Sequence, residues 1–134
     1  MRDNAKAKAK AAALVFLSAL GLSVALAAPL LAADHAVLRV VVVKSDNPDA
    51  YVKEIDRGRE LLKKLGTTQT IRVWRARFAG EQAGSIVVAV EYPSMASMAK
   101  DEAAIEANPE YIAWYKGLDK LRTVVSDSLY TEMK

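Results

Sequence analysis

The residues with the clearest chemical potential lie between positions 70 and 93. Arg75 and Arg77 stand in the segment TIRVWRARF, which reads as one strand of a β-hairpin. An arginine on a central strand needs a partner, because a buried guanidinium without a counter-charge is costly. One role is a structural ion pair with Glu91 at a sheet rim or dimer interface. The other is the capture of an anionic ligand, for which the guanidinium fork is well suited.

The hairpin connection sets which residues of the two strands meet. We interpret residues 80–84 as a five-residue turn with glycine at both ends. In this register Arg75 lies opposite Ala89, and Glu91 lies one diagonal step from Arg75. The sequence therefore predicts that Arg75 and Glu91 are neighbours.

Aromatic side chains form a second group of candidates. Tyr111, Trp114 and Tyr115 recur at helical spacing, which is more typical of core anchors than of a cofactor site. The alternative is a pocket in which a phenol hydroxyl or the indole N–H orients a flat apolar ligand. No catalytic residue is assigned. The candidate ligand-binding residues are Trp74, Arg75, Arg77, Glu91, Tyr92, Tyr111 and Trp114.

Several site chemistries are excluded by composition. Cysteine is absent and His35 is the only histidine, so disulfides and thiolate chemistry are excluded and zinc or haem would have few ligands. A hydrolytic triad would lack its nucleophile motif. Acid–base work by Glu91, Asp127 or a tyrosine stays open, because carboxylates on strands are not diagnostic. We predict no metal and no cofactor.

The elements that position these residues follow a simple order. Two helices begin at Asn-Pro signals, at Asn47 and Asn108, and another begins at Ser94. Strands are predicted over residues 35–44, 70–93 (a hairpin) and 122–133. The order β-α-β-β-α-β is the split βαβ pattern of an α+β ferredoxin-like fold, with a four-stranded antiparallel sheet and helices on one face. The other face needs a cover, which predicts a homodimer.

The first 33 residues differ from the rest of the chain. A basic start, the uncharged run of residues 11–28 and small residues at 25–27 predict a signal peptide over residues 1–27, with cleavage after residue 33 as the second option. The competing interpretation is an uncleaved anchor, since residues 11–33 could span a bilayer. We expect residues 34–134 to be one exported domain, periplasmic or secreted, with a membrane as partner only if the leader is retained.

Charge argues against nucleic acid as a partner. The whole chain has a formal net charge of +3, but residues 34–134 hold fifteen Lys and Arg against fifteen Asp and Glu. Nucleic-acid binding needs a basic patch or stripe, and no such run stands out in this region.

The hairpin VWRARF…GSIVVAVEYPS, followed by a helix that ends before NPEYIAWY, resembles the dimeric α/β-barrel superfamily. This group includes the antibiotic monooxygenase-like, NIPSNAP-like and EthD-like proteins. The resemblance spans residues 34–134 in pattern and topology, without a subfamily signature. It implies a homodimer whose two sheets form a barrel, with any ligand pocket between each sheet and its own helices. Haem-using relatives need an axial histidine inside the domain, and this sequence has none there.

These observations favour an exported small-ligand-binding or accessory protein, homodimeric and metal-free, whose ligand is a small aromatic or anionic molecule. The resemblance implies an enzyme alternative, a cofactor-independent monooxygenase or isomerase acting on an aromatic or hydroxylated substrate. A third alternative is a structural dimer whose pocket is filled by its own side chains. Whether the chain is an enzyme is left open, with the balance against catalysis.

Overall fold

The computed structural model describes residues 35–133, so the predicted signal peptide and its cleavage sites lie outside the described residues. No helix within residues 35–133 is long and apolar enough to cross a membrane. The elements are β1 (Val37–Lys44), α1 (Pro48–Leu65), β2 (Thr70–Arg75), β3 (Ile86–Tyr92), α2 (Met95–Glu106), α3 (Pro109–Gly117) and β4 (Thr123–Thr131), with short 3-10 turns η1 (Gly80–Gln82) and η2 (Leu118–Lys120).

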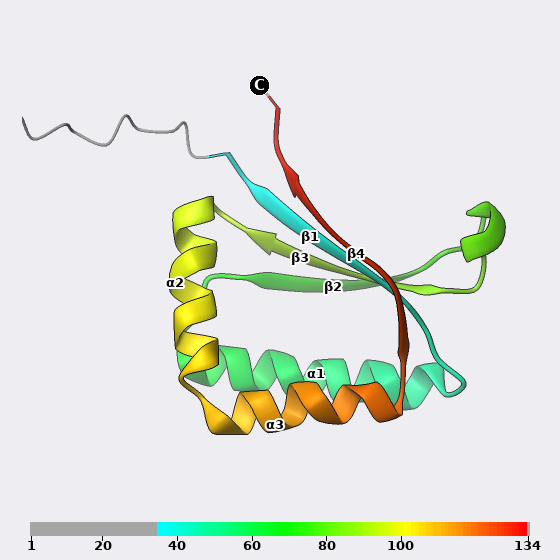
Figure 1. The fold of residues 1–134 in the computed structure, drawn as a ribbon, viewed down its shortest axis with the longest axis horizontal. Coiled ribbons are helices and arrows are strands. Elements are labelled where there is room, and N and C mark those ends of the chain that lie inside the picture. The colour runs from blue at the N-terminus through cyan, green and yellow to red at the C-terminus, as the bar shows by residue number, and fades with distance from the viewer. Residues whose placement is uncertain (1–34, 134) are drawn as a thin grey trace, which may run out of the picture. The chain divides into compact units, whose positions relative to one another are not determined.

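The four strands form one antiparallel sheet in the order β2-β3-β1-β4. Figure 1 shows α1 and α3 running together beneath the sheet, with α2 at the end where β3 leaves it. The predicted α+β ferredoxin-like fold is confirmed, with three helices because the second helical region is divided between α2 and α3.

The helix boundaries arise where the sequence predicts them. Asn47 and Asn108 each accept a hydrogen bond from a backbone N–H three residues later, at 3.1 and 2.8 Å, and a proline follows each cap. At the end of α1, Gly66 has φ +68° and its N–H bonds back to the last turn. These local signals fix both ends of α1 and the start of α3.

The contact between α1 and α3 depends on a glycine. The Trp114 ring of α3 lies directly on Gly58 of α1, where an added Cβ would overlap the indole. The indole Nε1 donates a hydrogen bond to the Glu54 carbonyl at 2.9 Å. Gly58 therefore permits a close approach that a larger residue would prevent, which explains a glycine in a helix interior despite its cost of about 1 kcal/mol relative to alanine.

The two faces of the sheet differ in cover. The helix-covered face is defined here by Val41, Val43, Ile86 and Val88, all buried in the main core. The open face is defined by the side chains that alternate with them along the strands. These are Leu38, Val40 and Val42 of β1, Val87 and Ala89 of β3, and Arg72 and Trp74 of β2. Burial of β1 is continuous over residues 41–43, while residues 38–40 are half-buried.

The hairpin register departs from the prediction by three residues. β2 ends at Arg75, which pairs with Ile86, and residues 76–85 form the connection. This connection is longer than the predicted turn because η1 and two glycines with positive φ, Gly80 and Gly84, close a wider loop. Arg77 lies in this loop rather than on the strand.

The register shift changes the partner of Glu91. Glu91 lies opposite Thr70 on the open face, and its nearest cation is Arg72, with Arg72 Nη2 and Glu91 Oε2 3.6 Å apart. The predicted neighbour Arg75 belongs to the other face of the strand. The Arg75–Glu91 pairing was therefore wrong, because an odd register shift moves every cross-strand contact to the opposite face.

Candidate functional site

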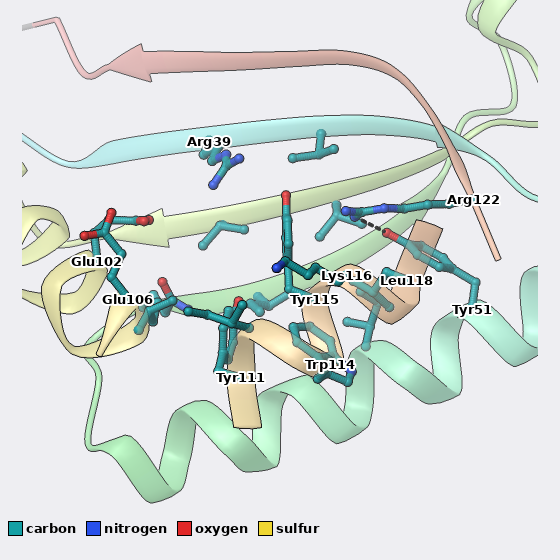
Figure 2. A pocket seen from close by; sticks show the side chains of 18 of the residues that line it. Arg39, Tyr51, Glu102, Glu106, Tyr111, Trp114, Tyr115, Lys116, Leu118 and Arg122 are labelled. Carbon is teal, nitrogen blue, oxygen red and sulfur yellow. Dashed lines mark hydrogen bonds between the residues drawn. The ribbon is translucent and has the colours of Figure 1, made fainter. Parts of the chain in front are cut away.

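A cavity of about 320 Å³ lies between the helix-covered face of the sheet and the three helices (Figure 2). Apolar side chains from the strands, including Val41, Val88 and Val90, form its sheet side. Five aromatic or phenolic side chains reach it from β3 and the helices. They are Tyr51, Tyr92, Tyr111, Trp114 and Tyr115.

The aromatic rings of α3 support one another. Tyr111 lies 5.0 Å from Trp114 and 6.4 Å from Tyr115, ring centre to ring centre, with the two tyrosine rings nearly parallel. Trp114 is only 7% exposed and belongs to the core. Its N–H is already bonded to the Glu54 carbonyl, so Trp114 offers a ligand its ring face and not a hydrogen-bond donor.

One charged pair sits at the cavity between β1 and β4. Arg39 donates to both carboxylate oxygens of Asp127, at 2.9 Å from Nε and 2.6 Å from Nη2. The hydrogen bond from Arg39 holds the pKa of Asp127 below its usual value. Because the pair is bidentate, the Arg39 charge is already neutralised within the chain.

Arg122 is the second arginine of the cavity and its surroundings differ. Its side chain is 5% exposed, Nη1 donates to the Tyr51 hydroxyl at 3.3 Å, and the guanidinium lies 4.9 Å from the centre of the Tyr115 ring. Burial lowers the pKa of Arg122, but its contacts with Tyr51 and Tyr115 outweigh burial and leave that pKa raised. Arg122 is therefore a permanent buried cation against two phenols.

The phenols of the cavity are kept neutral. Burial raises the pKa of Tyr51. Burial also raises the pKa of Tyr111 to about 12, and the negative charge of Glu102 adds to this shift. Burial also raises the pKa of Tyr92, whose hydroxyl donates to Glu102 Oε1 at 3.2 Å. At neutral pH these groups are hydrogen-bond donors and acceptors and carry no charge.

Two buried polar atoms of the cavity-lining residues lack a hydrogen-bond partner within residues 35–133. They are Gln69 Oε1 and Arg122 Nε. Gln69 is fixed through its backbone, whose N–H donates to the buried Asp101 carboxylate at 3.1 Å. Buried polar groups are normally satisfied, so these atoms mark positions where a ligand atom would be stabilised.

The structure brings together three of the seven candidate residues. Tyr92, Tyr111 and Trp114 line the cavity. Trp74 and Glu91 lie on the open face, while Arg75 ends β2 and Arg77 lies in the exposed loop. Glu91 and Tyr92 also border a second hollow of about 520 Å³ beside the start of β1 and the end of β4.

Sequence reasoning missed Arg39 and Arg122. Arg39 alternates with Val41 and Val43 on β1, so strand periodicity alone places it on the same face as the core valines. Arg122 gives no such signal, because it lies between η2 and β4, where neither period applies. No group of three or more histidines, aspartates or glutamates able to hold a metal ion occurs among the described residues.

Solved structures with the same architecture include two described families. The chain is similar to SnoaB, a cofactor-independent oxygenase from Streptomyces nogalater, with a TM-score of 0.57 and 15% identity over 75% of this chain and 95% of that one. A NIPSNAP family protein from Agrobacterium tumefaciens gives a TM-score of 0.55 and 17% identity over 75% and 91%. These likenesses show the fold, a four-stranded antiparallel sheet with helices in a ferredoxin-like α+β arrangement.

A further similar structure is that of an uncharacterised NIPSNAP-like domain protein from Burkholderia xenovorans, with a TM-score of 0.50 and 11% identity over 75% of this chain and 86% of that one. No protein-family model and no curated protein matches the chain. At such identities the likeness carries the fold and not the activity, so any function must be argued from the cavity itself.

Proposed function

We propose that this protein binds a small, largely flat organic ligand in the cavity between the sheet and its helices, and acts as an exported homodimer. The observation that carries the proposal is the cavity itself, a space of about 320 Å³ lined by aromatic rings and bordered by buried polar atoms without partners in the described part of the chain. Aromatic and apolar walls with a few placed polar groups are typical of small-molecule sites.

The cavity favours binding over the structural alternative. A dimer that only stabilises itself would fill this space with its own side chains, as protein interiors generally do. Here Tyr111, Trp114 and Tyr115 border the space, and the phenol hydroxyls of the two tyrosines can orient a ligand by hydrogen bonds.

Native mass spectrometry of the protein purified from its own host, with an absorbance spectrum of the same sample, tests this proposal. We expect a mass above that of the chain and an absorbance beyond that of its tyrosines and tryptophans. Trp114→Phe keeps an aromatic ring but leaves more space and should retain the ligand, whereas Val88→Phe, which fills the cavity from the sheet side, should lose it. A ligand-free protein that also binds no aromatic probe would contradict the proposal.

The homodimer follows from the open face of the sheet. Trp74 and Tyr130 on this face are 57% and 55% exposed, although Val42 and Ala89 beneath them are buried. A second copy of the same face is the simplest cover of matching shape. Sedimentation at micromolar concentration should give a dimer, and Trp74→Arg should give a monomer that still binds the ligand. A monomeric wild type would contradict this part.

Export rests on the composition of residues 1–27, which lie outside the described structure. Intact mass measurement of the protein from fractionated host cells should find a chain that begins at residue 28 or 34 in the exported fraction. A full-length chain confined to the membrane fraction would instead support the uncleaved anchor.

A second candidate is a cofactor-independent monooxygenase, favoured by the hydrogen bond between Tyr92 and Glu102 inside the cavity. In such a reaction Glu102 would accept a substrate phenol proton, and O₂ would supply one oxygen to the ring and one to water, as when a naphthol becomes a naphthoquinone. Oxygen uptake with 1-naphthol should then occur and should fall at least about tenfold in Glu102→Gln. Binding without oxygen uptake would reject this candidate and leave the binding proposal intact.

A further inference from the structure

The charges around the cavity are not balanced in the same way at its two ends. Figure 2 shows Glu102 and Glu106 of α2 at one end and Arg122 with Tyr51 at the other, with Tyr115 between them and pointing toward the sheet. Arg39 lies near the acidic end and is held by both oxygens of Asp127. Lys116 also lines the cavity but is exposed to solvent, so the buried cation with the least compensated charge is Arg122.

Arg122 has no carboxylate hydrogen-bonded to it within residues 35–133, and its one ion pair there is long. The closest acid is Asp119, with its Oδ1 3.5 Å from Arg122 Nε, but the Asp119 side chain is 71% exposed and Nε makes no hydrogen bond. The other partner, Tyr51, is a neutral phenol and cannot compensate a charge. The Arg122 side chain is only 5% exposed, and a guanidinium whose charge is compensated only by one exposed carboxylate carries a desolvation cost.

The hydrogen-bond directions at Arg122 leave room for an incoming anion. Tyr51 accepts from Arg122 Nη1, so the phenol proton of Tyr51 is still available to donate. The guanidinium offers its other terminal N–H groups, and the Tyr115 ring supports one of its faces. A planar acceptor with two oxygens fits this set, because a guanidinium binds a carboxylate through two parallel hydrogen bonds.

We propose that Arg122, assisted by the Tyr51 hydroxyl, is the receptor for the carboxylate of an aromatic monocarboxylic acid, whose ring lies along Tyr115 and Tyr111. This inference rests on the proposed function and names the chemical class of its ligand. The acidic end at Glu102 and Glu106 repels a second carboxylate, so the ligand carries a single negative charge and ends there in a neutral or hydrogen-donating group.

The aromatic walls also decide between a carboxylic acid and inorganic phosphate. Phosphate would meet the charge of Arg122 but would leave the apolar surface of Val88, Val90 and Trp114 uncovered. A ring system removes that surface from water, and the burial of apolar area is the larger contribution to affinity for small ligands in such sites.

The test uses two probes of the same size, 2-naphthoate and 2-naphthamide, titrated calorimetrically into the full domain, with inorganic phosphate as a third titrant. Wild type should bind naphthoate about tenfold or more tightly than naphthamide, the ratio expected for a charge-assisted pair of hydrogen bonds. Arg122→Gln should abolish that ratio while naphthamide affinity stays within about twofold. Arg57→Gln removes an exposed arginine of α1, 63% exposed, and should leave the ratio unchanged.

The outcomes separate this inference from the proposed function. Equal affinity of wild type for both naphthalene probes, or an unchanged ratio in Arg122→Gln, overturns the role of Arg122 and leaves the cavity as a binding site. Phosphate binding as tight as naphthoate overturns the aromatic acid as the ligand class. If neither naphthalene probe binds, the proposed function fails as well.

A second measurement covers the case in which Arg122→Gln does not fold. In wild type, the Arg122 Nε–H resonance, assigned with the conservative variant Arg122→Lys, should shift on addition of naphthoate and stay in place with naphthamide. An identical response of this resonance to both probes overturns the proposal without recourse to the glutamine variant.

Discussion

The two faces of the sheet are formed by the same four strands but present different kinds of side chain. The helix-covered face holds core valines, the Arg39–Asp127 pair and a cavity with neutral phenols, whereas the open face holds Leu38, Val40 and a half-exposed Trp74. Strand alternation makes this division possible, because each strand supplies every second side chain to each face. The comparison teaches that chemistry concentrates where helices enclose the sheet, and that the open face is suited to assembly.

The largest effect on stability is expected from replacing the tryptophan on the helix-covered face, with the tryptophan on the open face as its control. Trp114 is 7% exposed and Trp74 is 57% exposed. Trp114→Ala should lower the free energy of unfolding by about 3–5 kcal/mol through loss of burial and a new cavity. Urea denaturation measures the change. Trp74→Ala is the matched control.

For Trp74→Ala we expect a loss that is small at low protein concentration and grows as the concentration rises, since Trp74 lies outside the core and would be buried by the proposed dimer. A Trp74→Ala loss equal to that of Trp114→Ala at every concentration would show that the two faces are not distinct.

The tyrosines of the covered face predict a loss of stability at alkaline pH. The folded pKa of Tyr111 is about 12 against an ordinary value of 10, so the neutral phenol is favoured by folding. The stability is fully present below pH 10 and is lost as pH rises toward 12, by about 2 kcal/mol from this residue. Thermal unfolding measured at successive pH values should show a shallower fall for Tyr111→Phe. Parallel curves for the two proteins would contradict the burial argument.

Substitution of two glycines, one at the contact between α1 and α3 and one away from it, tests how closely these helices pack. Gly58→Ala improves helix propensity by about 1 kcal/mol, but the new Cβ overlaps the Trp114 ring, so we expect a net loss of about 1–2 kcal/mol. In Gly117→Ala the new Cβ meets nothing within 4 Å and φ is −65°, so we expect a gain of about 0.5 kcal/mol. Chemical denaturation of both variants measures the pair. A gain for Gly58→Ala would refute the close contact.

The smallest effects on stability are expected from removing one ion pair on each face of the sheet. Asp127→Asn should cost about 0.5–1 kcal/mol at neutral pH, because the bidentate pair with Arg39 is only partly exposed. Since Arg39 lowers the pKa of Asp127 from 3.8, the difference from wild type should begin to shrink as pH falls below 3.8 and should vanish below the lowered pKa of the folded state. Glu91→Gln on the open face, where the charges are 3.6 Å apart and half exposed, should change unfolding by less. A larger effect for Glu91→Gln would reverse the ranking of the faces.

The sequence predicted the fold better than the site, for physical reasons that particular residues illustrate. Asn47-Pro48 and Asn108-Pro109 act on their own neighbours, so helix starts could be read locally. The position of Tyr111 and Trp114 followed from helical period. The hairpin register did not, because the loop of residues 76–85 is stabilised by η1 and its glycines rather than by strand pattern.

The site was harder to predict than the fold, because hydrophobic periodicity does not single out its polar residues. Arg122 lies between two elements, and its partner Tyr51 is 71 residues away in the chain. Arg39 was hidden within a valine run whose alternation could have identified it. Arg75 and Arg77 stood out in the sequence only because both fell on one predicted strand. The structure ends this strand at Arg75, so Arg77 lies in the loop.

The most direct test of the central claim is a crystal structure of the protein grown with 2-naphthoate. The account predicts the naphthalene ring in the cavity against Tyr115, its carboxylate bonded to Arg122 and the Tyr51 hydroxyl, and a second copy of the chain on the open face. Naphthoate bound on the open face beside Trp74, with the cavity empty, would contradict it.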